Sequence, residues 1–356
     1  MKNKNKEKVE LALSTINVTA ITPKVIAPII DDVARADVVV AQLFKPIRDL
    51  VNTSGRKLEI PIYKNYISIS SDVAEGNTVP ASSFSYDATT IQVAKFGIRV
   101  DFQKEAIESP QRDILKDAVY MTGKEFANEL DLRAETILLD LKVGTISTFS
   151  GGTLGSTSLT PIIDVKTLSA GTISSVDYYD GKVLLASSIA ACTVTFTYSN
   201  RCSTLGTSLL QDATGKQTLT VSDVFTLKNS MVDKTIAPDV MLLNSKDMKN
   251  LLADASFQNL FEYTDDKKYN GEIGKLLDLT LVSSKILPEG VAILVESDRL
   301  GYEVIKRDLT SYEEALYDYD NVAYHMWSER EYGVSDANAV GVVVNLKTGS
   351  YPAANL

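Results

Sequence analysis

The sequence predicts an α+β fold in which a long helix and an extended two-stranded ribbon accompany a β-rich insertion. Apolar residues recur every three or four positions over 109–142, the helical period, and every second position over much of 56–102, the strand period. A stretch whose first part is rich in Ser and Thr follows over 144–217. The 356 residues suffice for two or three compact units. We expect a flat or elongated subunit.

The chain begins with a polar segment and a helix. Residues 1–23 are polar with scattered Val, Leu and Ile, which is typical of either an extended arm or a disordered tail. Helical spacing over 27–51 predicts a helix whose first turns contain Asp31 and Asp32. Pro46 should kink or end this helix.

Two alternating segments within 56–102 predict a long two-stranded arm. Leu58 and Ile60 lie in the first segment, Ile98 and Val100 lie in the second, and a polar stretch between them forms a broad tip. A lone two-stranded ribbon is only marginally stable in water. We therefore expect the arm to lie on the body of its own subunit or on a neighbouring subunit.

Helix signals are strongest over 109–142. Ser109 can cap this helix, and Pro110 suits its first position. A helix of this length spans roughly 48 Å at 1.5 Å per residue. Its charged residues, Asp131 and Glu135 among them, are predicted to line the solvent face.

The second half of the chain alternates short strands and helices. Over 144–217, short β-prone pieces separated by turn residues predict an inserted β-rich domain, and the alternative is a flexible linker. Residues 218–260 predict a helix, a strand and a second helix. Strands return over 273–308, 321–333 and 339–346.

The sequence contains no recognisable catalytic constellation. Its single histidine, His325, lies in a strand pattern without a Gly-x-Ser-x-Gly elbow elsewhere in the chain. Residues 271–276 contain a Gly-Lys pair, but Tyr269 and Leu276 replace the first glycine and the last hydroxyl residue of a phosphate-binding loop. We expect no catalytic residue, no cofactor and no enzymatic activity.

Metal and disulfide chemistry have little support. A single histidine excludes most zinc sites. Cys192 and Cys202 flank a hairpin pattern, and in a reducing cytosol we expect two free thiols rather than a disulfide. One cluster of carboxylate residues could bind a hard cation, but the cluster lacks the glycine-containing loop of a calcium site and is more typical of a solvated surface. Its members are Asp308, Glu313, Glu314, Asp318 and Asp320.

The net charge limits the partners. The chain has 36 Lys and Arg against 46 Asp and Glu, a formal charge of −10, which is unsuited to coating nucleic acid. The lysines of the first eight positions form either a solvated tail or a small contact for an acidic partner or nucleic acid. Neither a membrane-length apolar run nor the apolar stretch of a signal peptide is present, so we expect a cytosolic protein without membrane contact.

The order of these elements resembles the major capsid protein of tailed phages and related archaeal viruses, the Hong Kong 97-type fold. Order and spacing carry the resemblance, because no single motif is specific. The matching segments are GRKLEIP at 55–61, VAEG at 73–76, FGIRV at 96–100, QKEA at 103–106, IAPDVMLLN at 236–244, LVSSKILPEG at 281–290, SERE at 328–331 and AVGVV at 339–343.

The resemblance implies a division of the chain into six parts, of which the insertion exceeds the minimal fold. These parts are an N-terminal arm and helix (1–51), the extended β-hairpin called the E-loop (52–102), a peripheral domain with the long spine helix (103–143), the β-rich insertion domain (144–217), an axial domain (218–300) and a return to peripheral-domain strands (301–356).

The resemblance also implies a function. It implies self-assembly through hexamers and pentamers into an icosahedral shell that encloses double-stranded DNA non-specifically. The expected location is the virion capsid, assembled in the cytoplasm of a prokaryotic host. Residues 1–51 leave no room for a fused scaffolding domain, so the implied partners are other copies, a separate scaffolding protein, a portal and a decoration protein.

Three charged residues are predicted assembly contacts, and two other functions stay open. The contacts are Glu75 on the arm and Arg307 and Arg330 on the peripheral domain. An encapsulin-type nanocompartment shell would have the same fold. A glycan-binding surface protein would use the β-rich insertion.

Overall fold

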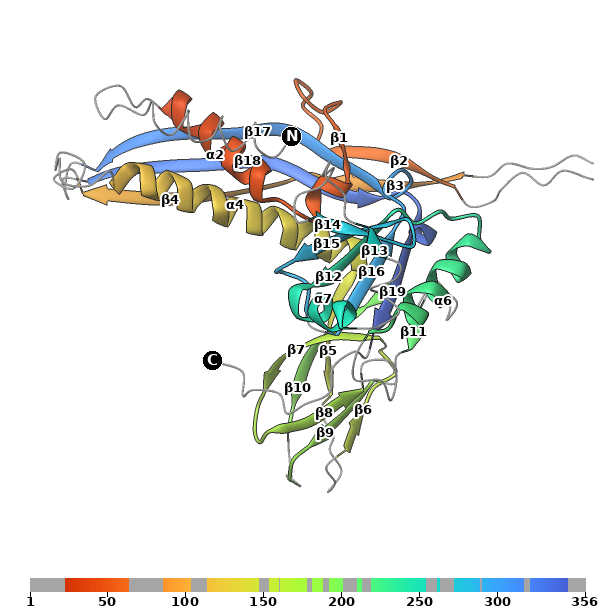
Figure 1. Cartoon of the computed structure of the whole chain (residues 1–356). Coiled ribbons are helices and arrows are strands. Elements are labelled where there is room, and N and C mark those ends of the chain that lie inside the picture. Colours follow the sequence, from red (N-terminus) through yellow and green to blue (C-terminus); the bar gives the residue numbers. More distant parts are fainter. Residues whose placement is uncertain are drawn as a thin grey trace, which may run out of the picture.

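The structure, a computed structural model, describes residues 23–63, 86–103, 114–146, 154–159, 161–177, 181–187, 192–200, 210–212, 219–253, 261–262, 272–288, 290–316 and 321–344. Figure 1 shows three parts in succession: a long flat layer with two helices, a central sheet, and a smaller β-rich part. The subunit is elongated, as the sequence predicts.

Two helices cover one face of a four-stranded sheet in the long layer. Helix α2 (Pro23–Asp37) lies beside helix α4 (Ile114–Leu139). Phe96 of the sheet stacks on Phe126 of α4 with ring centroids 5.2 Å apart, so the apolar stripe of the long helix is buried. The strand order is β1 (Lys45–Ile47), β17 (Gly301–Leu316), β18 (Asn321–Val334) and β4 (Ala94–Gln103).

The first helix is shorter than the spacing predicts. α2 ends at Asp37, and the 3-10 turn η2 (Ala41–Leu43) and strand β1 follow where a single helix was expected over 27–51. The cause is a contact from outside this segment: Asp131 of α4 accepts hydrogen bonds from the backbone of 39–41 and so stabilises a turn. Pro46 lies in an edge strand, where its missing N–H is tolerated.

The arm is confirmed as a hairpin, but its second strand is split. β2 (Lys57–Tyr63) pairs antiparallel with β3 (Tyr86–Gln92), and this hairpin leaves one end of the long layer in Figure 1. After Val93 the chain continues as β4, which pairs with β18 rather than with the arm. The polar tip predicted between the two strands lies outside the described residues.

A small apolar cluster holds the base of the arm. Ile91 of β3 lies over Gly333 of β18, where a Cβ would be only 1.9 Å from its Cδ1 atom. The glycine therefore creates the space that the isoleucine fills. The buried members of the cluster are Leu50, Ile60, Ile91, Val93 and Val304.

The central sheet has seven strands with both faces covered. Met241 and Leu243 face the core that includes α6 (Val221–Val232) and α7 (Ser245–Leu252), whereas Val240 and Leu242 face the core shared with the long layer. The strand order is β11 (Leu210–Asp212), β19 (Val340–Val344), β16 (Val291–Val295), β12 (Val240–Asn244), β15 (Leu279–Ser284), β14 (Glu272–Leu276) and β13 (Phe261–Glu262).

Two strands of this sheet come from parts of the chain that the resemblance places elsewhere. β19 lies within 301–356, the expected return to the peripheral domain, and β11 lies within 144–217, the expected insertion. β19 follows the short η5 turn (Ala337–Ala339) and pairs antiparallel with β16, which directs it away from the long layer.

The described residues of the insertion form a folded β unit. Two three-stranded sheets enclose a common core that contains Ile162, Val183 and Phe196. Cys192 is buried in this unit, and its thiol donates to the carbonyl oxygen of Ala170. The sheets are β5 (Leu141–Ile146), β10 (Val194–Ser199) and β7 (Ile162–Leu168), and β6 (Leu154–Ser156), β9 (Lys182–Leu185) and β8 (Ile173–Asp177).

Gly97 of β4 tests how tightly the long layer is packed. A Cβ at Gly97 would lie 2.1 Å from the carbonyl oxygen of Met326, a backbone atom that cannot move aside, so Gly97→Ala should lower the free energy of unfolding by roughly 2 kcal/mol. At Gly55 such a Cβ meets nothing within 4 Å, so Gly55→Ala should stay within about 0.5 kcal/mol of the parent. Urea denaturation monitored by the fluorescence of Trp327 compares the two variants with the parent. Equal unfolding midpoints for Gly97→Ala and Gly55→Ala would contradict the prediction.

Candidate functional site

The residues that the sequence offers as candidates for chemistry lie in regular strands of the described structure. His325 lies in β18, as the strand pattern predicts, with Nε2 2.8 Å from a carboxylate oxygen of Glu314. Residues 272–276 form strand β14, so the Gly-Lys pair is not in a phosphate-binding loop. Across the described ranges, no group of three or more His, Cys, Asp or Glu residues is placed to hold a metal. No helix among these residues is long and apolar enough to cross a membrane.

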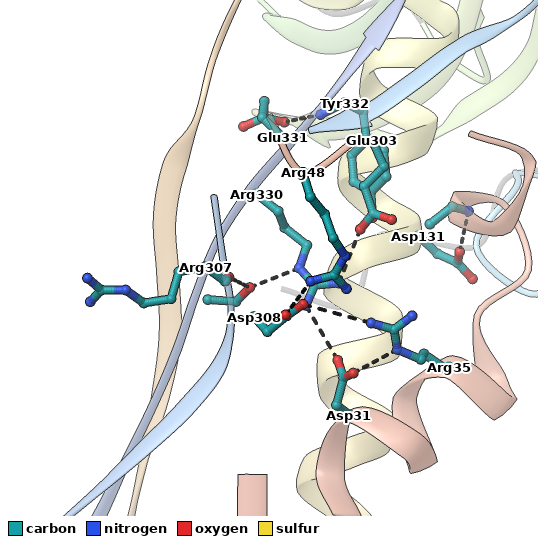
Figure 2. Close-up of polar contacts among 12 residues, drawn as sticks. Asp31, Arg35, Arg48, Asp131, Glu303, Arg307, Asp308, Arg330, Glu331 and Tyr332 are labelled. Carbon is teal, nitrogen blue, oxygen red and sulfur yellow. Dashed lines mark hydrogen bonds and ion pairs between the residues drawn. The ribbon is translucent and has the colours of Figure 1, made fainter. Parts of the chain in front are cut away.

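The strongest polar feature is a buried ion-pair network centred on Arg330 (Figure 2). The Arg330 side chain is 3% exposed, and its guanidinium is 3.1 Å from Glu303 of β17 and 3.4 Å from Asp31 of α2. Its Nε also donates to the hydroxyl of Ser328 at 2.9 Å. Because a buried charge is costly unless it is paired, this geometry ties α2 to β17 and β18.

A second, more exposed group of charges surrounds Asp308 beside this network (Figure 2). Arg48 donates to Asp308 at 2.5 Å, and this hydrogen bond lowers the pKa of the Asp308 carboxyl below its usual value. Arg35 lies 3.9 Å from the other oxygen of Asp308 and pairs with Asp31 at 2.7 Å. These half-exposed pairs each contribute at most about 1 kcal/mol.

Asp131 of α4 acts as a buried anchor for the backbone. Its carboxylate accepts hydrogen bonds from the N–H groups of Val39, Val40 and Ala41 at 2.8–3.1 Å. Burial raises the pKa of Asp131 to about 6, and the three backbone donors oppose that rise. At neutral pH the group is therefore an ionised acceptor that holds the turn after α2.

Glu135 lies one helical turn beyond Asp131 and is only 4% exposed. Burial raises the pKa of its carboxyl to about 8; Lys166 of β7 lowers it, and Asp164 and Asp131 raise it further. The solvent-face prediction for Asp131 and Glu135 was therefore wrong. Both continue a buried row that includes Ala127 and Leu139, and this four-residue spacing was the available signal.

The three predicted assembly residues are not brought together within one chain. Glu75 lies outside the described residues. The Arg307 side chain is 51% exposed and 4.0 Å from Glu329. Arg330 is committed to the buried network described above. An intersubunit role for these residues stays a prediction.

Comparison with solved structures shows a fold shared with phage capsids and an encapsulin. The Cyanophage Pam1 capsid matches with a TM-score of 0.53 at 12% identity, over 88% of this chain and 89% of that chain. The capsid of Cyanophage P-SCSP1u matches with a TM-score of 0.52 at 12% identity, over 85% and 87%. The holo-SrpI encapsulin complex from Synechococcus elongatus PCC 7942 matches with a TM-score of 0.50 at 10% identity, over 88% and 90%. No family model and no curated protein matches the sequence.

The predicted resemblance is therefore confirmed at the level of the fold. The agreement covers nearly the whole length of each chain, although few residues are identical. Such agreement fits a resemblance based on the order of elements rather than on any motif.

Removal of the Asp131 carboxylate should destabilise the subunit strongly. Asp131→Ala leaves three backbone N–H groups without their acceptor, and we expect a loss of roughly 3 kcal/mol or more in the free energy of unfolding. Asp131→Asn keeps one acceptor oxygen and should lose less. Glu125→Ala, at an exposed position of the same helix, is the control. Equal urea midpoints for Asp131→Ala and Glu125→Ala would show that the contact anchors nothing.

Glu135 should make stability fall as the pH rises. A carboxyl whose pKa is higher in the folded than in the unfolded chain holds its proton more tightly when folded. Its contribution to the free energy of unfolding is therefore full below about pH 4.5 and is lost as the pH rises toward about 8. Between pH 5 and 7.5 the parent should lose on the order of 3 kcal/mol more than Glu135→Gln, whose amide cannot ionise.

Urea midpoints measured across this pH range test that difference. Glu125→Gln, on the exposed face of α4, should keep the pH profile of the parent. If the urea midpoints of Glu135→Gln and of the parent changed with pH in the same way, the raised pKa assigned to Glu135 would be refuted.

Proposed function

We propose that this protein is a major capsid protein that assembles into a shell. The observation that carries the proposal is the fold, which matches the Pam1 capsid over 88% of this chain and 89% of that one. Little of the chain is left for a separate catalytic domain. The described residues form a layered structure with a projecting hairpin, and such a hairpin needs support from outside itself.

We infer that the shell is icosahedral and encloses double-stranded DNA. Identical subunits close into rings through heterologous contacts, which suits hexamers and pentamers. Obligate interfaces commonly bury about 2,000–5,000 Å², and an elongated subunit with an arm offers such areas. The net charge of −10 suits a wall that encloses DNA without binding it tightly.

The parts of the subunit receive roles by analogy with the family. We assign the E-loop to the β2–β3 arm, the spine helix to α4 and the peripheral domain to the four-stranded sheet. The axial domain corresponds to the seven-stranded sheet, and β5 to β10 form the insertion. Arg307 is the more accessible of the two proposed arginine contacts for Glu75 of a neighbour, because Arg330 is buried.

The proposed partners follow from the same role. We infer a separate scaffolding protein, a portal and a decoration protein, and a location in the virion after assembly in the cytoplasm of a prokaryotic host. Uniform shells formed by this chain when it is expressed alone would count against a separate scaffolding protein.

An encapsulin-type compartment is the second candidate, because the holo-SrpI encapsulin complex shares the fold. Electron microscopy of the protein, expressed with and without the products of neighbouring genes, separates the two. Shells filled with a protein cargo would favour an encapsulin. Shells that need a scaffolding partner and take up DNA would favour a capsid.

Shortening the arm should abolish assembly without unfolding the subunit. Tyr63 and Tyr86 are the last paired residues of the hairpin, so replacing 64–85 by Asn-Gly closes it with a two-residue turn and keeps the Ile91 cluster. We expect the shortened subunit to stay soluble and to unfold at the same temperature as the parent. In sedimentation it should run as free subunits, with no material at the position of shells. Arg307→Ala should reduce assembly far less, since an exposed pair contributes at most about 1 kcal/mol. Normal shells from the shortened chain would refute the role of the arm.

A further inference from the structure

Strand β4 is an open and regular edge of the four-stranded sheet. Among the described residues it pairs on one side only, with β18, and this ladder runs from Ala94 to Gln103 without a register shift. An edge of this kind presents a row of backbone N–H and C=O groups that can pair with another chain.

Most of the other edges of the two larger sheets carry features that discourage such pairing, although residues 310–316 of β17 also pair regularly with β18 and lie beyond the reach of β1. β1 has three residues and contains Pro46, and β17 beside it has two register irregularities between Ile305 and Thr310. The central sheet ends in β11 and β13, which have three and two residues. Short strands, proline and bulges are the usual means of protecting an edge. β4 has ten residues, contains no proline and pairs without a bulge.

The sequence of β4 is complementary to itself in antiparallel order. When two copies are aligned with Ile98 opposite Ile98, Lys95 of each copy faces Asp101 of the other. In the same register Phe96 faces Val100, and Gly97 faces Arg99. Charged and apolar pairs directly opposite each other are those that stabilise antiparallel strands. A shift by one residue would place side chains on opposite faces and lose this match.

Three of the side chains that the pairing uses are exposed, whereas Phe96 and Val100 pack against the core of their own subunit and Lys95 lies over the ring of Trp327. Ile98 is 39% exposed although it is apolar, and Lys95 is exposed as well. Asp101 is 47% exposed and has Arg99 of its own strand as a neighbour, so a second cation can reach its other oxygen.

We propose that β4 pairs antiparallel with β4 of a second copy across a two-fold axis, with Ile98 at the centre, so that two four-stranded sheets become one continuous sheet. The contact is isologous, because the same strand serves on both sides. This proposal deepens the proposed function by assigning one contact between subunits, and it rests on that function only in requiring that copies associate.

A cysteine scan in the full chain tests the register. Directly opposed residues of an antiparallel pair have Cα atoms about 4.5–5.5 Å apart, within disulfide range. Ile98→Cys should therefore form covalent dimers under mild oxidation on a non-reducing gel. Lys95→Cys alone should not, since the two copies of residue 95 would be roughly 20 Å apart at ~3.3 Å per residue. A mixture of Lys95→Cys and Asp101→Cys chains should form dimers. The parent chain, with Cys192 and Cys202, is the control.

Exchanging the charges of Lys95 and Asp101 tests the register through a rescue of the dimer yield, which misfolding would not reproduce. Added to Ile98→Cys, either Lys95→Asp or Asp101→Lys places like charges opposite each other and should lower the dimer yield at least fivefold. The two changes together restore opposite charges and should restore the yield. A yield that stays low in the doubly exchanged chain would contradict the register.

The outcomes distinguish this proposal from the proposed function. Shells seen by electron microscopy without Ile98→Cys dimers would overturn the β4 pairing and leave the capsid proposal standing. Dimers without shells would support the pairing and count against the capsid. Cross-linking of Ile98→Cys to a cysteine placed at Thr90 of the arm would show that the arm covers this edge, and would overturn the pairing.

Discussion

The shape of the subunit depends on one constraint, the single residue between its arm and its sheet. β3 ends at Gln92 and β4 begins at Ala94, and the buried Val93 between them donates its N–H to the carbonyl oxygen of Arg56 at 2.9 Å. Even the tightest common hairpin needs a two-residue loop, so β3 cannot fold back on β4. The arm therefore leaves the sheet, and β4 keeps one edge without a strand partner among the described residues.

The base of the projecting arm belongs to a layer whose elements are joined by a buried polar network. Arg330 joins β17, β18 and α2, and Asp131 fixes the turn that leads from α2 to β1. β1 pairs with β17 next to the apolar cluster that holds the arm. The long layer thus behaves as one packed body from α4 to the base of the hairpin.

Local patterns predicted most of this fold, and tertiary contacts determined the rest. The helical period within 109–142 and the turn-rich 144–217 segment are local signals, and the structure contains α4 and a β unit there. The division at Val93 has only a small local signal, a change of phase in the apolar alternation from Ile91 and Val93 to Phe96 and Ile98, which does not say which strand each part pairs with. The burial of Asp131 and Glu135 was missed because charged residues usually face water, and this preference outweighed their four-residue spacing from Ala127 and Leu139; packing of α2 and β5 against α4 reverses it. The described part of the candidate site is therefore mostly a product of contacts between distant segments.

The buried ion pairs of Arg330 are better explained by the orientation that they impose on the elements they join than by a gain in the free energy of unfolding. An apolar set of the same volume often stabilises a protein as well as a buried ion pair does. Apolar packing, however, tolerates small shifts, whereas the hydrogen bonds of a guanidinium fix direction as well as distance. Arg330 and Asp31 are separated by 299 residues, so their contact sets the position of the first helix against strands near the end of the chain. In the proposed shell of many identical subunits, small errors in such a joint would accumulate from one neighbour to the next, which would give a directional contact an advantage over a stronger but looser one.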